Sequence, residues 1–366
     1  MKTRAIPVVF RPILKPKPWG GQKLAQLFGK ALPPGGRLGE SWELSDLPEN
    51  ESVVRDGPQQ GRTIRELVSE WGADLLGRAA LVDGRFPLLI KFLDARENLS
   101  IQVHPKPAPE SSPTPVAGVK HEAWYVVQAD EEAGILLGVK PEVDIHDVRR
   151  SLGTAELVPL LRRWRVRTGD SFYLPSGVPH ALCAGVVAAE VQTPSDVTYR
   201  MYDWDRVDES GQPRPLHLSE AMTNLRLDVT PAELKPPRSH SAGPHALVTR
   251  VAACPSFLVS RVRLAAGLQQ ALPDTEMLIW ILLNGSGALL RAGEFRVPFT
   301  AGDTVLIPAA NDGIRIETAD DIQFLEVSVP IPRIGRTADR EPAHAGRRGP
   351  LTQLRTPGNS LLGGKS

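Results

Sequence analysis

The chain has 366 residues. A single hydrophobic core rarely extends over a chain of this length, so we expect two packed units. Its composition, 41% hydrophobic and 23% charged, excludes the disordered and fibrous classes, and its net charge of +1 gives no reason to expect nucleic acid or membrane as a partner. Two cysteines are too few for a disulfide framework, and no stretch has the apolar length of a signal peptide or a membrane span, which together predict a cytoplasmic protein.

The first third of the chain changes from loops to a helix and then to strands. Residues 6–42 are rich in Pro and Gly and predict loops and edge strands, with one short helix over 22–28. In residues 63–76, apolar side chains recur at three- and four-residue steps, which is typical of an amphipathic helix. Four β-type runs follow, and their short spacing indicates antiparallel sheets: 87–94, 100–103, 123–128 and 134–139.

A helical pattern returns between residues 143 and 163, which predicts a helical insertion between strands. The β pattern resumes in 171–174 and 186–192, and a short helix is expected over 218–225. A second β-rich stretch occupies 246–329.

The second β-rich stretch repeats part of the first. The segment Gly169-Asp-Ser-Phe-Tyr-Leu-Pro175 has a counterpart in Gly302-Asp-Thr-Val-Leu-Ile-Pro308, and the apolar runs that begin at Trp124 and Trp280 lie upstream of them. We therefore predict a mostly β protein made of two related β-barrels. The expected limits are a first domain over 1–240 with helical insertions near 60–80 and 141–165, a second domain over 241–331, and a loosely ordered basic tail over 332–366.

One motif points to a metal ligand. Gly169-x5-Pro175-x-Gly177-x2-His180 predicts a strand that enters a tight turn and delivers an imidazole to the mouth of a barrel. These residues match the second sequence motif of the cupins through its histidine, although Ala184 stands where that motif often has asparagine. The match predicts a jelly-roll barrel of the cupin type.

Three further side chains fit the same site. Gln102 and His104 are two apart on a predicted strand and therefore point to the same face. Glu122 opens an apolar strand, where a carboxylate needs a partner or a metal. Two imidazoles, a carboxylate and an amide oxygen suit a catalytic zinc ion. Pro308 is followed by Ala-Ala-Asn-Asp-Gly, without the histidine that follows Pro175, so we expect the second barrel to be degenerate and without metal.

Several segments, in this order, resemble the type I phosphomannose isomerases in their short bacterial form, from about residue 15 to 329. The segments are Lys15-Pro-Lys-Pro-Trp-Gly-Gly21, Gly39-Glu-Ser-Trp-Glu43, Leu89-Ile-Lys-Phe-Leu-Asp94, Leu99-Ser-Ile-Gln-Val-His-Pro105, Lys120-His-Glu122, Gly177-Val-Pro-His180, Glu190 and Tyr199-Arg-Met-Tyr-Asp-Trp-Asp205. The resemblance implies that Gln102, His104, Glu122 and His180 bind one zinc ion and that Arg200 lies in the active site. It also implies that mannose 6-phosphate and fructose 6-phosphate are interconverted through a cis-enediolate.

The residues allow roles in such a reaction to be assigned as expectations. Arg200 is a permanent cation that can stabilise an enediolate or hold phosphate, but it is a poor base. Lys120 and Glu190 are the candidates for proton transfer, and the sequence does not choose between them. Ser100, with Arg200 or Lys120, is expected to bind the phosphate. The partner is then a small sugar phosphate, and we expect a monomer or a weak homo-oligomer.

Two other functions fit a cupin-type fold. A non-catalytic sugar-binding or regulatory protein would keep the fold without the reaction, but Arg200, Lys120 and Glu190 beside four ligand candidates argue against it. An iron-dependent oxidoreductase is the second alternative. Its sites more often have histidine where Gln102 stands.

Overall fold

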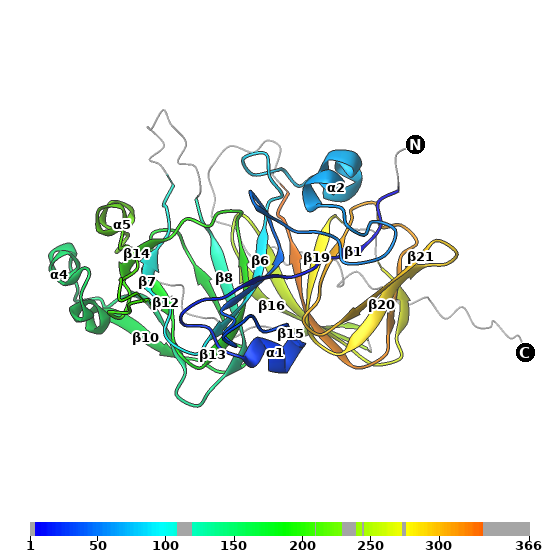
Figure 1. Ribbon diagram of the computed structural model, residues 1–366. Helices are drawn as coiled ribbons and strands as arrows, with labels where there is room; N and C mark the ends of the chain where they lie inside the picture. The colour runs from blue at the N-terminus through cyan, green and yellow to red at the C-terminus, as the bar shows by residue number, and fades with distance from the viewer. Residues whose placement is uncertain are drawn as a thin grey trace, which may run out of the picture.

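The computed structural model describes residues 4–107, 119–208, 210–228, 239–243, 245–272 and 276–331. In those residues the chain is a mostly β protein whose four larger sheets follow one another as layers (Figure 1). The predicted tail, 332–366, lies outside the described residues. None of the helices in the described part has both the length and the apolar character needed to cross a membrane.

The first half of the molecule consists of two antiparallel sheets. The five-stranded sheet has the order β10 (Leu161–Arg165), β9 (Gly134–Val139), β12 (His180–Leu182), β7 (Ile101–Val103) and β14 (Tyr199–Tyr202). The six-stranded sheet has the order β11 (Ser171–Leu174), β8 (Glu122–Ala129), β13 (Val186–Gln192), β6 (Leu89–Ala95), β3 (Glu40–Leu44) and β2 (Ile13–Lys15). Buried side chains from both sheets, among them Trp124, Val186, Ile135 and Leu182, form one core between them.

The second half has the same plan. The seven-stranded sheet has the order β1 (Val8–Val9), β22 (Thr304–Ile307), β19 (Leu278–Asn284), β24 (Ile322–Ser328), β17 (Leu258–Leu264), β16 (Ala246–Ala253) and β15 (Ser239–Gly243). The four-stranded sheet has the order β18 (Gln269–Ala271), β23 (Arg315–Thr318), β20 (Ser286–Arg291) and β21 (Phe295–Thr300). Trp280, Phe324, Leu289 and Phe299 belong to the core that these two sheets share.

The two halves pack through the outer faces of their larger sheets. Ile90 and Tyr125 of the six-stranded sheet lie in the same buried cluster as Ile279 and Leu325 of the seven-stranded sheet. This follows from the strand sequences, because most residues of β6, β13 and β19 are apolar and buried on both faces, as in strands that are covered on both sides. The amino-terminal strand β1 pairs with β22, so the start of the chain contributes to the second half.

The helices cover sheet edges and faces, and two of them differ from the prediction. The helix expected over 63–76 begins at Thr63 with a capping box to Glu66, but it is interrupted at Gly72, whose φ of 53° breaks it into α2 (Ile64–Trp71) and α3 (Ala73–Leu76). The helical insertion of 143–163 is shorter than expected. It contains α4 (Ile145–Ser151) and a 3₁₀ segment, η1 (Ala155–Leu160), and the remaining residues form β10.

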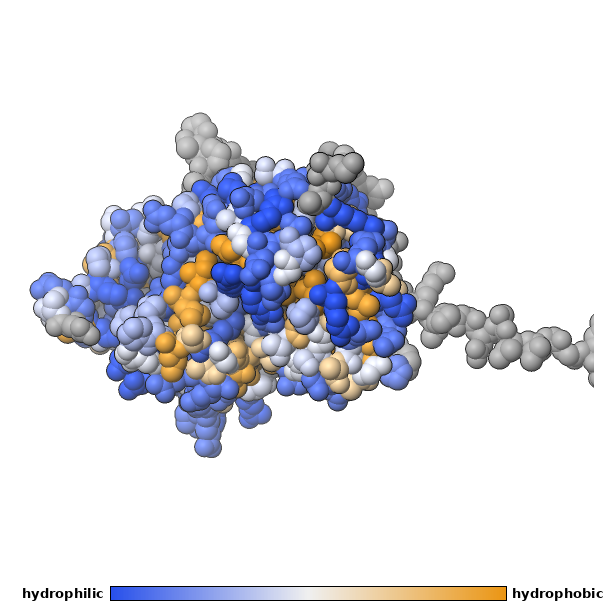
Figure 2. Space-filling model, turned by 45° about the vertical axis from the view of Figure 1, so that its right-hand side comes forward, coloured by the Kyte–Doolittle hydropathy of each residue, from blue (hydrophilic) through white to orange (hydrophobic). Residues whose placement is uncertain are grey.

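The other short elements agree closely with the pattern. The predicted helices at 22–28 and 218–225 are α1 (Lys23–Phe28) and α5 (Leu218–Asn224), and a small ribbon joins β4 (Asp46–Leu47) to β5 (Asn50–Glu51). On the face drawn in Figure 2, apolar residues reach the surface in separate areas among polar ones. Such scattered exposure is ordinary for a folded domain.

Candidate metal centre and active site

Four predicted ligands meet at one end of the first half. Gln102 lies in β7 and His104 directly follows it, Glu122 opens β8, and His180 opens β12. His180 is the cross-strand partner of Gln102 in the antiparallel pair β12–β7. The strands therefore bring together side chains that are up to 78 positions apart in the sequence.

The geometry of three of these residues is that of a metal site. The ligand atoms of His104, Glu122 and His180 lie within 4.8 Å of one another, and all three residues are buried. The Nε2 atom of His104 is 2.8 Å from Oε2 of Glu122, yet both buried atoms lack a hydrogen-bond partner in the described residues. Buried ligand atoms as close together as those of His104, Glu122 and His180 fit one shared cation.

Each of the two imidazole rings is held by a backbone carbonyl at its Nδ1 atom. Nδ1 of His104 lies 3.1 Å from the carbonyl oxygen of Val197, and Nδ1 of His180 lies 2.9 Å from that of Val178. A carbonyl accepts only, so each ring carries its proton on Nδ1 and presents the Nε2 lone pair to the site. Burial lowers the pKa of both histidines, which keeps the rings neutral as metal binding requires.

The fourth candidate, Gln102, is beside the cluster. Its side-chain Nε2 is 3.4 Å from Nε2 of His180, and its Oε1 accepts a hydrogen bond of 3.2 Å from Ser100 Oγ. The two ends of an amide have the same shape, and turning the amide over directs Oε1 at the metal position. In that orientation the NH₂ group faces the Ser100 hydroxyl, which can accept from it. All four residues thus fit a bound metal.

A buried lysine keeps Glu122 ionised. Burial acts to raise the pKa of Glu122, but the Lys120 ammonium, 3.2 Å from Oε2, acts against it together with a hydrogen bond to Glu190 and the charges of His180 and Lys91. Their sum lowers the pKa to about 2. Lys120 itself is only 3% exposed. The site therefore has an ionised carboxylate and a cation next to it.

Glu190 lies in the same network but has different electrostatics. The indole N–H of Trp124 is shared between Glu122 and Glu190, 2.8 Å from an oxygen of each. Burial and the neighbouring charge of Glu122 raise the pKa of Glu190, while Lys91, 3.1 Å from Oε1, opposes the rise. Two adjacent carboxylates are thus held at different proton affinities, a pattern found where one of them transfers protons.

A cavity of about 300 Å³ opens onto this cluster. All the residues predicted to bind substrate or to take part in catalysis line its walls: Ser100, Lys120, Glu190 and Arg200. Gln102 and Glu122 line it as well. His104 and His180 lie behind this surface and are fully buried. Arg200 lies in β14, opposite Gln102 in β7, so the sheet itself sets it beside the ligands.

Sequence reasoning missed several charged residues that line the cavity. They are Lys17, Glu40, Lys91, Asp196, Arg214 and His217. For Lys91 a signal was present, since it is a single lysine between apolar residues in Leu-Ile-Lys-Phe-Leu, and a lysine buried in a strand requires a charged partner. Glu190 and Glu40 are those partners. Burial acts to lower the pKa of Lys91, but the charges of Glu190 and Glu40, with those of Asp196 and Glu122, together raise it.

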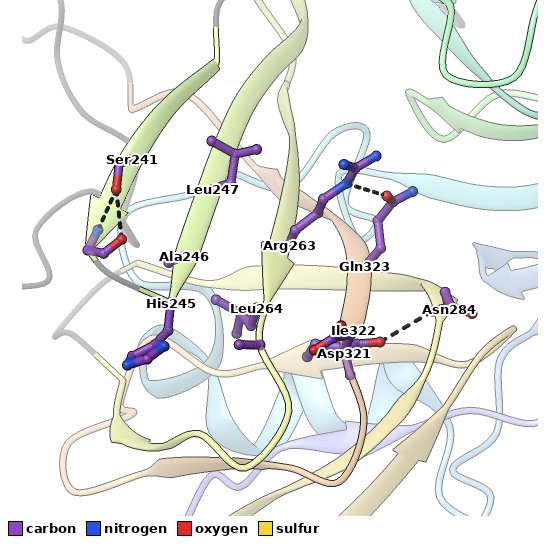
Figure 3. Close-up of a pocket in the computed structure, with 12 residues that line it drawn as sticks. Ser241, His245, Ala246, Leu247, Arg263, Leu264, Asn284, Asp321, Ile322 and Gln323 are labelled. Atoms are coloured by element: carbon purple, nitrogen blue, oxygen red, sulfur yellow. Dashed lines mark hydrogen bonds between the residues drawn. The ribbon is translucent and has the colours of Figure 1, made fainter.

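A larger cavity, about 530 Å³, occurs at the edge of the seven-stranded sheet and shares no lining residue with the first (Figure 3). Its polar groups bond to one another: Arg263 donates to Gln323 at 2.7 Å, and Asn284 donates to the carbonyl of Asp321 at 3.2 Å. His245 and Asp321 are the only histidine and carboxylate among the described residues that line it. This cavity therefore lacks a convergent set of ligand groups.

The fold and the cluster define a mostly β protein with a candidate metal centre in a polar cavity, and comparisons identify its family. Residues 9–124 match the family model described as "Phosphomannose isomerase type I, catalytic domain". Mannose-6-phosphate isomerase ManA of Bacillus subtilis is 34% identical over 313 residues, which are 85% of this chain and 96% of the relative. A mannose-6-phosphate isomerase of Streptococcus mutans serotype c is 33% identical over 306 residues, 83% of this chain and 93% of the relative.

A solved structure agrees with these relatives. The crystal structure of the mannose 6-phosphate isomerase from Bacillus subtilis superimposes with a TM-score of 0.77 at 30% identity and covers 88% of this chain and 100% of that chain. This chain belongs to the type I phosphomannose isomerase family. The resemblance predicted from the sequence motifs is confirmed.

Proposed function

We propose that the chain is a zinc-dependent mannose-6-phosphate isomerase, which interconverts mannose 6-phosphate and fructose 6-phosphate. Family membership supports the activity. The observation that carries the metal dependence is the cluster of three buried ligand atoms, from His104, Glu122 and His180, within 4.8 Å of one another.

Four residues would hold the metal: Gln102, His104, Glu122 and His180. Two imidazole nitrogens, a carboxylate and an amide oxygen, with no thiolate, favour zinc in a catalytic site over a closed structural site. A zinc ion held there would supply a Lewis acid that orients the substrate oxygens and stabilises negative charge on the enediolate.

The chain's own groups would carry out the proton transfer between C1 and C2. Glu190 is the better base of the two candidates, because burial and the Glu122 charge raise its pKa toward neutrality and the indole of Trp124 orients it. Lys120 is a buried ammonium paired with Glu122, so it suits the opposite task, donating to the substrate oxygen that becomes negative. Arg200 supplies further donors to that charge or to the phosphate.

The fold supports a finer assignment as well. Each half pairs two antiparallel sheets around its own core, as in a cupin-type jelly-roll barrel. We assign the metal-binding domain to residues 1–240 and the degenerate domain to 241–331, with the addition that β1 joins the second half. The substrate is a small sugar phosphate, and a monomer or weak homo-oligomer stays a prediction.

Two kinds of variant test these roles in a coupled assay for mannose 6-phosphate isomerisation, with zinc measured by elemental analysis of the same sample. His104→Ala and Glu122→Ala should lose zinc and activity together, since each removes a ligand. Arg200→Ala should keep zinc and lose turnover about 10²-fold or more. Retention of zinc and activity in His104→Ala would exclude the assigned metal site.

A further inference from the structure

One wall of the active-site cavity carries two guanidinium groups, those of Arg200 and Arg214. Arg200 is half-buried, and its Nε is shielded from solvent with no hydrogen-bond partner among the described residues. Arg214 lines the same cavity. Burial and the charge of Arg214 lower the pKa of Arg200, and the charges of Asp203 and Asp196 oppose this lowering only in part.

The nearest buried acid is already occupied. Asp203 is 5% exposed and accepts from Arg214 through Nε at 2.7 Å and through a terminal nitrogen at 2.5 Å, and it also accepts from Arg206 at 2.6 Å. This two-point contact fixes the plane of the Arg214 guanidinium. Asp203 therefore positions Arg214 but leaves Arg200 unpaired.

A third donor lies beside these two. The backbone N–H of Arg200 points to Nδ1 of His217 at 3.2 Å, and the backbone N–H of His217 donates to the carbonyl of Arg200 at 2.9 Å. Because Nδ1 accepts, the neutral ring carries its proton on Nε2. His217 lines the cavity, so Nε2–H is the group it offers to a ligand there.

We propose that Arg214 and His217, together with Arg200, form the phosphate-binding part of the active site, and that Asp203 is the positioning residue for Arg214. This inference rests on the proposed function for the identity of the substrate. Two guanidinium groups and an imidazole N–H fit a phosphate dianion, which takes planar, two-point donors and neutralises the paired positive charge. The arrangement also extends the expected site beyond Ser100, Arg200 and Lys120.

The segment that carries these residues is built to hold them in place. Asp208 and Gln212 form a turn through a backbone hydrogen bond of 2.8 Å, and Val207 forms a β-bridge with Pro213. Arg214 follows that bridge directly, and His217 pairs with β14 through Arg200. The phosphate group is thus assigned to a part of the chain that contributes none of the proposed metal ligands.

The test combines steady-state kinetics with calorimetric titration of the zinc-loaded protein by inorganic phosphate. Arg214→Gln should raise both KM for mannose 6-phosphate and the dissociation constant of inorganic phosphate by about 10- to 100-fold, with a much smaller change in kcat. Arg214→Lys keeps the charge but not the two-point contact, so it should give an intermediate rise. The matched control is Arg165→Gln, an exposed arginine paired with Glu132 outside the cavity.

The outcomes separate this inference from the proposed function. A folded Arg214→Gln variant with unchanged phosphate affinity overturns the inference. If Arg214→Gln does not fold, the phosphate affinities of His217→Gln and Arg214→Lys are measured instead. Unchanged phosphate affinity in both variants also overturns the inference. Wild-type protein that binds phosphate through Arg214 but does not isomerise mannose 6-phosphate contradicts the proposed function and leaves the anion site standing.

Discussion

The two halves of the molecule contain the same tryptophan–glutamate pair in different surroundings. In the first half, Glu190 in β13 is the cross-strand partner of Trp124 in β8 and accepts from its indole. In the second half, Glu326 in β24 is the partner of Trp280 in β19 and accepts from its indole at 3.2 Å. The strand orders β11-β8-β13-β6-β3 and β22-β19-β24-β17-β16 correspond, so the pairs occupy equivalent places.

The neighbours of each pair differ. Lys91 lies across from Glu190, whereas Ser260 lies across from Glu326. At the position of Glu122, two residues before the tryptophan, the second half has Leu278. Burial therefore raises the pKa of Glu326 to about 7, since the Trp280 hydrogen bond and the charge of Arg250 offset it only in part. The comparison teaches that the proton affinity of a buried glutamate is set by the charges around it.

The largest effect should come from removing the acid in the first half. We expect Glu190→Gln to lower kcat by about 10²- to 10⁴-fold, the usual contribution of a general base, while zinc stays bound. Glu326→Gln is the matched variant and should leave kcat unchanged. The kcat of both variants is measured by steady-state kinetics. An equal loss of kcat in the two would contradict a catalytic role for Glu190 that Glu326 does not share.

The next largest effect is on stability in the second half. The pKa of Glu326 is raised from 4.5 to about 7 by folding, so the folded chain binds more protons than the unfolded chain between these values. The stabilisation of the folded state by this proton is fully present below pH 4.5 and is lost as pH rises through 7. The free energy of unfolding is therefore lower by about 3 kcal/mol at pH 8. Glu326→Gln should restore that amount.

Urea unfolding of Glu326→Gln and wild type at pH 5 and pH 8 measures this effect. The stabilisation should be large at pH 8 and small at pH 5, and the exposed Glu131→Gln serves as control. Equal differences at both pH values would show that the carboxyl of Glu326 does not titrate with folding.

The smallest effects should come from the tryptophans. Trp280→Phe removes one buried hydrogen bond and should lower the free energy of unfolding by about 1 to 2 kcal/mol without changing kcat. Trp124→Phe removes the donor that Glu122 and Glu190 share, so it should also lower kcat by about tenfold. The free energy of unfolding and kcat are measured for both variants. An equal change of kcat in the two would contradict the role given to Trp124 in holding Glu122 and Glu190.

Much of the fold followed from local pattern. Strands such as 134–139, 171–174 and 186–192 have the predicted bounds, because their apolar runs end at turn residues. The insertion of 143–163 was predicted less well. Leu161 continues the apolar spacing of a helix, but it lies in β10, which pairs with β9. Local periodicity does not predict such long-range strand pairing.

The proposed metal ligands were accessible to sequence reasoning because motif spacing and strand alternation place them together. Arg214 and His217 were not assigned, since their positions depend on contacts with Asp203 and Arg200 that local periodicity does not record. Lys91 was missed although its place in an apolar strand is a signal. The amide of Gln102 is an intermediate case. Its position was predicted, and which of its two ends faces the metal depends on the neighbouring Ser100 hydroxyl.

The most direct test of the account is zinc content and isomerisation rate measured together while a chelator removes the metal and zinc is added back. We predict about one zinc ion per chain. The rate with mannose 6-phosphate should fall in proportion to zinc removed and return in proportion to zinc restored. A protein that keeps its full rate after the zinc is gone would contradict the role given to Gln102, His104, Glu122 and His180.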